Sequence, residues 1–215
     1  MARGLFITFE GSEGCGKSTQ LVRLAERLRG LGREVVVTRE PGGTEIGEQL
    51  RQLLQFSTAG HRMVPETELL LFTASRAQLV REVIQPALAR GAVVIADRFL
   101  DSTTVYQGVA RKIDGAQVAA INHFAVGDCL PALTFLLDLD LAEARERMAL
   151  RAPRADAPDR MESEPAEFYE AVRRGYLELA TAHPQRIKVL GASQPIEAVA
   201  AEIWRVVEGK LMVES

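Results

Sequence analysis

The chain has 215 residues, of which 47% are apolar and 26% are charged, and its 26 basic and 29 acidic side chains give a net charge of −3. This composition predicts one globular domain over residues 1–215, and the charge argues against a broad surface for nucleic acid or membrane. The two cysteines do not indicate a disulfide framework, and no signal-peptide pattern or membrane-length apolar run is present. We therefore expect a cytoplasmic protein with no nucleic-acid or membrane partner.

The first motif lies between an expected strand at 4–10 and an expected helix at 20–31. It fits the phosphate-binding pattern G-x-x-x-x-G-K-[ST], in which the backbone N–H groups and the helix N-terminus bind phosphate. Lys17 would contact the β- and γ-phosphates, and the Ser18 hydroxyl would bind Mg²⁺. The alternative is a glycine-rich turn that binds nothing. The predicted ATP-binding residues are Gly11, Ser12, Glu13, Gly14, Cys15, Gly16, Lys17, Ser18 and Thr19.

An apolar segment at 33–38 reads as the next strand and completes a β-loop-α-β unit, which indicates a parallel sheet. Residues 38–44 then follow at the carboxyl end of this strand, where open α/β sheets bind ligands. Arg39 in this segment is placed to bind an anion, although it could also be a solvated arginine. A helix is expected at 45–55.

The longest helical pattern runs from Val64 to about Arg90. Phe72 and Arg76 are four residues apart and so project from the same side of this helix. Together they could take the face and the edge of a flat ligand such as a base. The alternative is that Phe72 belongs to the core and Arg76 extends to solvent.

A buried strand at 91–99 ends in an acid beside a base. After a phosphate loop, Asp97 is typical of a residue that holds Mg²⁺, and Arg98 can bind a phosphate through two parallel hydrogen bonds. As an alternative, the pair could only cap the strand. Further elements are expected as a polar helical turn at 101–108, a helix at 115–126 capped by Asp114, a strand at 134–138 and a helix at 141–150.

Residues 151–160 contain two prolines and three arginines and cannot form a continuous helix. We interpret residues 151–162 as a mobile basic lid that could close over bound phosphates, against the alternative of a disordered surface loop. A helix at 165–182, a strand at 186–190 and a helix from Pro195 complete the chain. We find no domain boundary, so the lid is an insertion in one domain.

These motifs together resemble the thymidylate kinase family, and the resemblance covers nearly the whole chain. The phosphate loop alone indicates only nucleotide binding, whereas the other segments in this order are specific to the family. The segments that carry the resemblance are Phe9-Glu10-Gly11, residues 38–44, Phe72 with Arg76, Asp97-Arg98-Phe99, Ser102 to Gly108 and Asp159-Arg160-Met161-Glu162.

The resemblance implies the α/β fold of P-loop nucleoside monophosphate kinases, which is a five-stranded parallel sheet flanked by helices with a short lid. It implies transfer of the γ-phosphoryl group of ATP to dTMP, with Mg²⁺ and in a homodimer. Analogy suggests that the helices beginning near Pro65 and Gly115 pack across its two-fold axis.

The family also implies roles for individual residues of the acceptor site. Phe72 would stack on thymine while Arg76 bonds the base edge, and Arg39 and Arg98 would hold the acceptor phosphate. Tyr106 would lie against the sugar at C2′, where a ribose hydroxyl would clash. The other implied contacts are Glu13 at the 3′-hydroxyl, Thr103 and Gln107 beside the base, and residues 192–194 beside adenine.

Some family members carry an arginine in the phosphate loop, but none of Ser12, Glu13, Gly14 and Cys15 is basic. The chain therefore resembles the bacterial type, in which a lid arginine contacts the transferring phosphoryl group. Our candidates are Arg151 and Arg154, with Arg147 as a third. The predicted catalytic residues are Lys17, Arg98, Arg151, Arg154 and Glu13.

Two other functions stay open at this point. One is a kinase for another nucleoside monophosphate or for a small metabolite. Phe72, Arg76 and Tyr106 are the residues that separate this function from that of a dTMP kinase. The other is a nucleotide-dependent switch protein. The sequence has no Asn-Lys-x-Asp guanine motif, and a switch has no use for two arginines at a second phosphate site.

Overall fold

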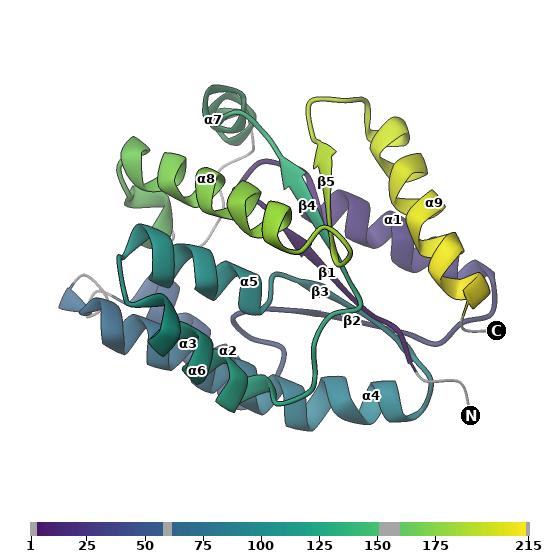
Figure 1. Ribbon diagram of the computed structural model, residues 1–215, viewed down its shortest axis with the longest axis horizontal. Helices are drawn as coiled ribbons and strands as arrows, with labels where there is room; N and C mark the ends of the chain where they lie inside the picture. Colours follow the sequence, from purple (N-terminus) through teal and green to yellow (C-terminus); the bar gives the residue numbers. More distant parts are fainter. Residues whose placement is uncertain (1–3, 58–61, 151–159, 214–215) are drawn as a thin grey trace.

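The computed structural model describes residues 4–57, 62–150 and 160–213, and it contains a five-stranded parallel sheet in the order β2-β3-β1-β4-β5 (Figure 1). The sheet was predicted as parallel, and this is confirmed by the register of every strand pair. The strands are β1 (Phe6–Glu10), β2 (Val35–Arg39), β3 (Val93–Asp97), β4 (Leu133–Asp138) and β5 (Ile187–Gly191).

The central strands are apolar over most of their length because helices cover both of their faces. All five residues of β1 are buried, as are the first four of β3. Each strand lies within two residues of its predicted position, which is the usual scatter of element boundaries.

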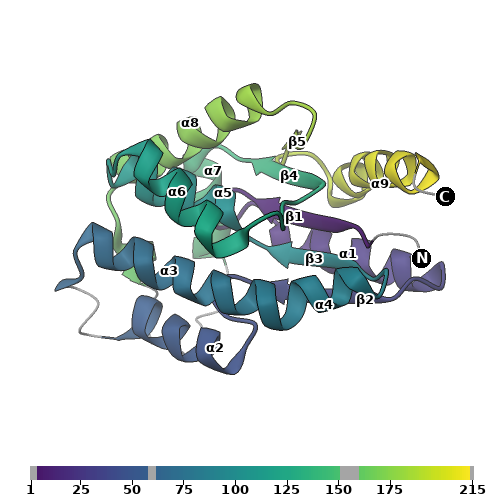
Figure 2. The ribbon, with the colours of Figure 1, turned by 60° about the horizontal axis from the view of Figure 1, so that its bottom comes forward.

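The helices form a layer on each side of the sheet (Figures 1 and 2). On one side, α1 and α9 bury Leu24, Leu28 and Ile203 against the strands. On the other side, the α3 to α4 segment packs with Leu79 and Ile84, and α8 packs with Val172. The α-helices are α1 (Lys17–Gly30), α2 (Glu45–Arg51), α3 (Pro65–Leu79), α4 (Gln85–Ala89), α5 (Leu100–Thr103), α6 (Gly115–Val126), α7 (Leu141–Ala149), α8 (Ala166–Ala182) and α9 (Ile196–Val213).

The helix expected between Val64 and Arg90 is present as one continuous helix that contains a π-helical segment. The π-helical η3 (Val80–Ile84) joins α3 to α4 just before Pro86. Pro86 has no N–H to donate to the preceding turn, so the regular ladder changes at this point. The other short helices are the π-helical η1 (Gln52–Phe56) and η4 (Thr104–Ala110) and the 3₁₀ helix η5 (Arg160–Ser163).

The predicted cap of α6 is confirmed, because Asp114 accepts hydrogen bonds from the backbone N–H groups of Ala116 and Gln117, both at 3.1 Å. Among the described residues, no helix combines the length and the apolar character that crossing a membrane would require.

The parallel arrangement brings the carboxyl ends of β1, β2 and β3 to one edge of the sheet. In the register, Asp97 at the end of β3 lies between Phe9 of β1 and Arg39 of β2. The segments that follow these strands are the phosphate loop, residues 40–44 and the start of α5. The fold thus gathers three segments that are distant in sequence.

We expect Leu28→Ala to destabilise the protein by about 2–5 kcal/mol, because Leu28 is fully buried between α1 and the sheet and its truncation leaves a cavity. Leu31→Ala is the matched control, since Leu31 is 60% exposed directly after the same helix, and it should change the free energy of unfolding by less than about 0.5 kcal/mol. Urea unfolding monitored by circular dichroism gives both values. Equal losses in the two variants would contradict this account of the core.

Candidate active site

The phosphate loop connects β1 directly to α1, and its glycines meet both conformational and steric demands. Gly11 has a φ of 133°, and a Cβ there would lie 2.5 Å from the carbonyl oxygen of Leu137. Gly14 has a φ of 77°, and its Cβ would lie 2.8 Å from the carbonyl oxygen of Ala144. Any larger residue at either position would have to displace backbone.

Lys17 is the first residue of α1 and is 6% exposed. Its ammonium group donates to the carbonyl oxygens of Gly11 at 3.1 Å and Ser12 at 2.8 Å, which folds the side chain back over the loop. Burial acts to lower the pKa of Lys17, but the Cys15 thiol and the carboxylates of Glu13 and Asp97 hold that pKa above its ordinary value. The loop therefore carries a fixed positive charge.

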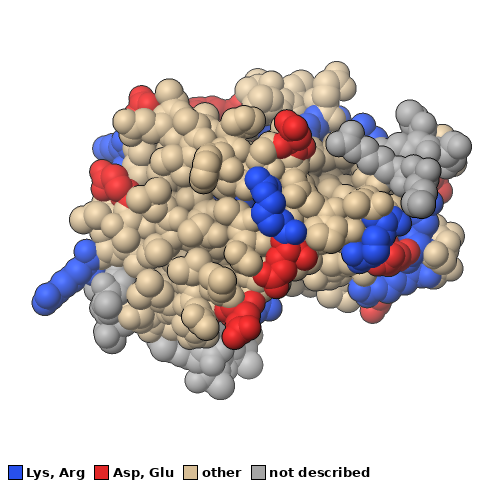
Figure 3. Space-filling model, turned by 90° about the horizontal axis from the view of Figure 1, so that it is seen from below, with Lys and Arg blue, Asp and Glu red and all other residues tan. Residues whose placement is uncertain are grey.

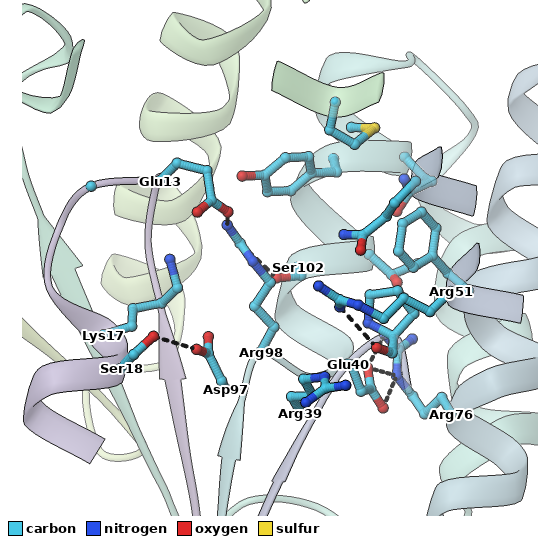
Figure 4. A pocket seen from close by; sticks show the side chains of 18 of the residues that line it. Glu13, Lys17, Ser18, Arg39, Glu40, Arg51, Arg76, Asp97, Arg98 and Ser102 are labelled. Carbon is cyan, nitrogen blue, oxygen red and sulfur yellow. Dashed lines mark hydrogen bonds and ion pairs between the residues drawn. The ribbon is translucent and has the colours of Figure 1, made fainter. Parts of the chain in front are cut away.

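Ser18 and Asp97 come together at the start of α1 and the end of β3. The Ser18 hydroxyl donates to Oδ2 of Asp97 at 3.2 Å, as Figure 4 shows. A hydroxyl and a carboxylate beside a phosphate loop are oxygen donors of the kind Mg²⁺ prefers, and Mg²⁺ is usually held by one or two carboxylates together with substrate phosphates. Among the described residues, no group of three or more His, Cys, Asp or Glu side chains forms a metal cage.

Arg98 occupies the turn between β3 and α5 with a left-handed φ of 69°, which is unusual for a residue other than glycine. Its Nη2 donates to Glu13 of the phosphate loop at 2.7 Å, and the side chain is 15% exposed (Figure 4). Burial acts to lower the pKa of Arg98, but Tyr106 and Glu13 hold that pKa well above its ordinary value. Arg98 is thus a permanent cation between the loop and a neighbouring cavity.

This cavity has a volume of about 280 Å³ and extends from the phosphate loop to α3, η4 and η5. Its size is close to the lower range of small-molecule sites. Most of the residues predicted from the sequence lie on its wall. They are Glu13, Gly14, Gly16, Lys17, Ser18, Arg39, Phe72, Arg76, Asp97, Arg98, Thr103, Tyr106 and Gln107.

Phe72 and Arg76 line the end of the cavity formed by α3. The alternative in which Arg76 extends to solvent is wrong, because Arg76 is 1% exposed. Its guanidinium donates through Nε and Nη2 to Glu40, with a shortest distance of 2.6 Å, and through Nη1 to Oδ1 of Asn122 at 2.7 Å. Nη2 also donates to the carbonyl oxygen of Phe99 at 3.3 Å. Among the described residues, one N–H of Nη1 has no protein acceptor.

Tyr106 lies between Arg98 and α8. The centre of its ring is 5.2 Å from the Arg98 guanidinium carbon, and its edge packs on Phe168. Burial raises the pKa of Tyr106, so the phenol is neutral. A neutral aromatic wall stands directly beside the charged arginine.

Gln107 and Thr103 are almost completely buried on the same side. Gln107 donates to Glu68 at 2.8 Å, and Glu68 also accepts from Arg111 at 3.1 Å and Arg160 at 2.6 Å. Glu68 therefore ties α3 to η4 and to η5, which begins at Arg160 within the predicted lid.

Arg39 lies at the mouth of the cavity and is less constrained than Arg98. Its side chain is 55% exposed and pairs with Glu48 of α2 at 2.9 Å. Burial acts to raise the pKa of Glu48, but hydrogen bonds from Gly43 and Arg39 lower it below its ordinary value.

Several predicted residues do not line the cavity. Cys15 is buried in the core behind the loop, and Thr19 is exposed on α1. Arg147 donates to Glu143 at 2.6 Å and to the carbonyl oxygen of Ala192 at 3.0 Å, which joins α7 to the predicted adenine segment after β5. Gly11 and Ser12 are likewise not among the lining residues, and the lid candidates Arg151 and Arg154 lie outside the described residues.

The cavity also contains residues that sequence reasoning missed. Arg51 is the last residue of α2 and lies within the helix expected at 45–55, and its Nη1 donates to the carbonyl oxygen of Pro41 at 3.0 Å. The one available signal was its spacing of seven residues from Thr44, the cap of α2. The missed lining residues are Glu40, Pro41, Arg51, Gln55, Ser102, Met161 and Tyr169.

Comparison with known proteins agrees with this geometry. The family model described as Thymidylate kinase matches residues 9–203. The thymidylate kinase of Syntrophotalea carbinolica is 48% identical over 203 residues, which are 93% of each chain. That of Deinococcus radiodurans is 47% identical over 207 residues, which are 96% of this chain and 98% of the relative.

A solved structure is also similar along nearly the whole chain. The crystal structure of thymidylate kinase from Ehrlichia chaffeensis has a TM-score of 0.77 and 35% identity, and the match covers 96% of this chain and 99% of that one. A family model over most of the chain and relatives of nearly equal length lead to one conclusion, which is that this chain belongs to the thymidylate kinase family.

Proposed function

We propose that this chain transfers the γ-phosphoryl group of ATP to dTMP, giving dTDP and ADP, with the acceptor bound in the cavity between the phosphate loop and α3. The observation that carries the proposal is the position of Arg98. It pairs with Glu13 of the phosphate loop at 2.7 Å and lines the same cavity as Phe72 and Arg76. Family membership supports this kinase over the switch protein that the sequence left open.

The reaction needs no covalent intermediate with the protein. The phosphate of dTMP is an anion and a sufficient nucleophile, so the protein has to align two phosphates in line and compensate their charge. Lys17 would compensate charge on the donor side and Arg98 on the acceptor side, with Arg39 at the mouth of the cavity. Tyr106, as a neutral wall, would fill the space at C2′ of the sugar, and Glu13 would accept from the 3′-hydroxyl.

The thymine base would lie at the α3 end. Phe72 is partly buried and lines the cavity, which supports a stacking role. Glu40 and Asn122 hold the guanidinium of Arg76 in one orientation, so its remaining N–H of Nη1 would be a fixed donor for a carbonyl oxygen on the base edge. Cytosine presents an amino group at the corresponding edge, and a fixed donor would discriminate against it. Thr103 and Gln107 would complete this end.

Mg²⁺ would be held by Ser18 and Asp97 together with the phosphates of ATP, and when bound it would offset charge on the β- and γ-phosphates. The hydroxyl and carboxylate described above suit this role.

We also propose a single domain with a lid at about 151–162. Cys15 and Cys129 are buried and are not joined to each other by a disulfide, which is consistent with a place in the cytoplasm.

We propose further that the chain forms a homodimer through α3 and α6. These helices lie side by side on the face shown in Figure 3, where charged side chains are sparse. Leu70 of α3 is 56% exposed and Phe124 of α6 is 86% exposed. Large exposed apolar side chains on a face with few charged side chains indicate a protein interface.

An acceptor panel tests the proposed reaction. We expect strong ADP release with Mg-ATP and dTMP, weaker release with dUMP, and almost none with UMP, dCMP, dGMP or no acceptor. A coupled ADP-release assay measures this directly. Turnover led by another acceptor would leave the kinase in place but contradict the roles given to Phe72, Arg76 and Tyr106.

The lid arginines are tested by Arg151→Ala, Arg154→Ala and the double variant. Because an arginine that compensates transition-state charge acts mainly in the closed enzyme, we expect kcat to fall by ~10³-fold for the residue involved, with little change in the KM for dTMP. Steady-state kinetics over both substrates gives the two parameters. Wild-type kcat in all three variants would show that the lid arginines do not compensate this charge.

Phe124→Glu tests the dimer. A charge within the proposed interface costs several kcal/mol to bury, so this variant should sediment as a monomer while the wild type sediments as a dimer. Met212→Glu is the control, since Met212 is 72% exposed and belongs to α9, a helix that lies away from α3 and α6 (Figure 1). A wild-type monomer, or a dimer that survives Phe124→Glu, would refute this interface.

A further inference from the structure

Glu10 is a completely buried carboxyl group directly behind the acceptor site. It is the last residue of β1 and is 0% exposed. Its Oε1 accepts from the backbone N–H of Phe99 at 2.8 Å, and its Oε2 accepts from Ser102 at 2.6 Å and from Tyr176 at 2.8 Å. One carboxyl group thus joins β1, the turn after β3, α5 and α8.

Three oxygen atoms form a closed triangle at this point. Oε2 of Glu10, Oγ of Ser102 and the phenol oxygen of Tyr176 are 2.6 to 2.8 Å from one another, including a contact of 2.8 Å between the two hydroxyls. Each contact at this distance requires one hydrogen. The two hydroxyls supply two hydrogens for three contacts. A proton on the Glu10 carboxyl group supplies the third.

The same two hydroxyls hold the guanidinium of Arg98. Its Nη1 donates to Ser102 and to Tyr176, each at 3.3 Å, while its Nη2 donates to Glu13 at 2.7 Å. When Glu10 is protonated, its O–H donates to one hydroxyl, that hydroxyl donates to the other, and the second hydroxyl donates back to Oε2 of Glu10. Each hydroxyl oxygen then keeps a lone pair that accepts from Arg98. Without that proton, two lone pairs meet between Ser102 and Tyr176, and a second anion lies behind Arg98 in competition with a bound phosphate.

Burial, together with the charged neighbours, brings the pKa of Glu10 close to neutrality. Burial and the nearby Asp101 raise the pKa of Glu10 to about 7, although Arg98 and the two hydroxyls act to lower it. Asp101 is itself paired with Arg186 at 2.6 Å. Burial and Glu10 hold the pKa of Tyr176 well above its ordinary value, so this phenol stays neutral.

We propose that Glu10 is a positioning residue for Arg98 and that its carboxyl group takes up a proton from solvent when the acceptor phosphate binds. The inference rests on the proposed role of Arg98 as a phosphate ligand. A bound phosphate anion favours the neutral carboxyl group behind Arg98, and by linkage the neutral carboxyl group strengthens phosphate binding to the same extent. The affinity for dTMP therefore falls as the pH rises above about 7, by about tenfold if binding raises the pKa of Glu10 by about one unit.

Calorimetric titration of the enzyme with dTMP tests this coupling. At about pH 8 the phosphate of dTMP is already a dianion, because the second pKa of a phosphate monoester is about 6. Titrations in two buffers with different ionisation enthalpies then report the protons bound by the protein. We expect an uptake of roughly 0.4 proton per dTMP in the wild type. The uptake should disappear in Glu10→Gln and persist in the control Glu178→Gln, which changes a 67% exposed glutamate on α8.

Tyr176→Phe tests the positioning role independently and retains Glu10. This variant keeps the packed ring and removes one acceptor of Arg98, so we expect the KM for dTMP to rise severalfold while kcat changes less. Combined with Glu10→Gln, it should add little further loss, because both act through the same hydroxyl.

The outcomes separate this inference from the proposed function. If dTMP does not bind the wild type, the acceptor site itself is wrong. If dTMP binds without proton uptake, or with the same uptake in Glu10→Gln, Glu10 is not the coupled group. If Glu10→Gln does not fold, an unchanged KM for dTMP in Tyr176→Phe still overturns the positioning role.

Discussion

The turn after β3 is the constraint on which the rest of the site depends. Arg98 adopts a left-handed backbone conformation that an arginine rarely occupies, and two contacts with β1 hold it there. Its N–H donates to the carbonyl oxygen of Phe9 at 2.9 Å, and the next N–H, that of Phe99, donates to Glu10 at 2.8 Å. These bonds aim the Arg98 side chain across the end of β1 toward Glu13. The phosphate loop and the acceptor cavity consequently have a fixed relation to one another.

The two buried arginines of this cavity are each paired with a different glutamate. Arg76 is paired with Glu40 at full burial, whereas Arg98 is paired with Glu13, which is 32% exposed at the cavity wall. The first pair is complete within the protein and leaves Arg76 as a rigid hydrogen-bond donor. The second pair is shared with the cavity, where an anion can take part of the charge of Arg98. Two arginines in one cavity thus serve different purposes because their partners differ in exposure.

The polar contacts beyond the cavity wall connect elements that are far apart in the chain. Glu68 receives hydrogen bonds from Gln107, Arg111 and Arg160, so the base side of the cavity is linked to Arg160, the first described residue of the predicted lid. Glu10 does the same for the phosphate side, with partners from the turn after β3, α5 and α8. Both carboxyl groups are buried and neither belongs to the cavity wall. Because these two residues link several helices, the shape of the site depends on how the helices pack.

The sequence by itself determined the fold class, the order of the elements and most of the cavity wall. Apolar runs, glycines and caps act locally, so β1, α1 and the cap at Asp114 could be located from a few neighbouring residues. Spacing along one helix placed Phe72 and Arg76 on the same side, the end of a buried strand pointed to Arg98, and the family pattern identified Tyr106. What only the tertiary structure decided is which partner each buried charge has. Arg76 is held by Glu40, 36 residues away, and Tyr176 meets Glu10 across 166 residues. Such pairs come from the crossing of strands and helices in space, which no local pattern encodes.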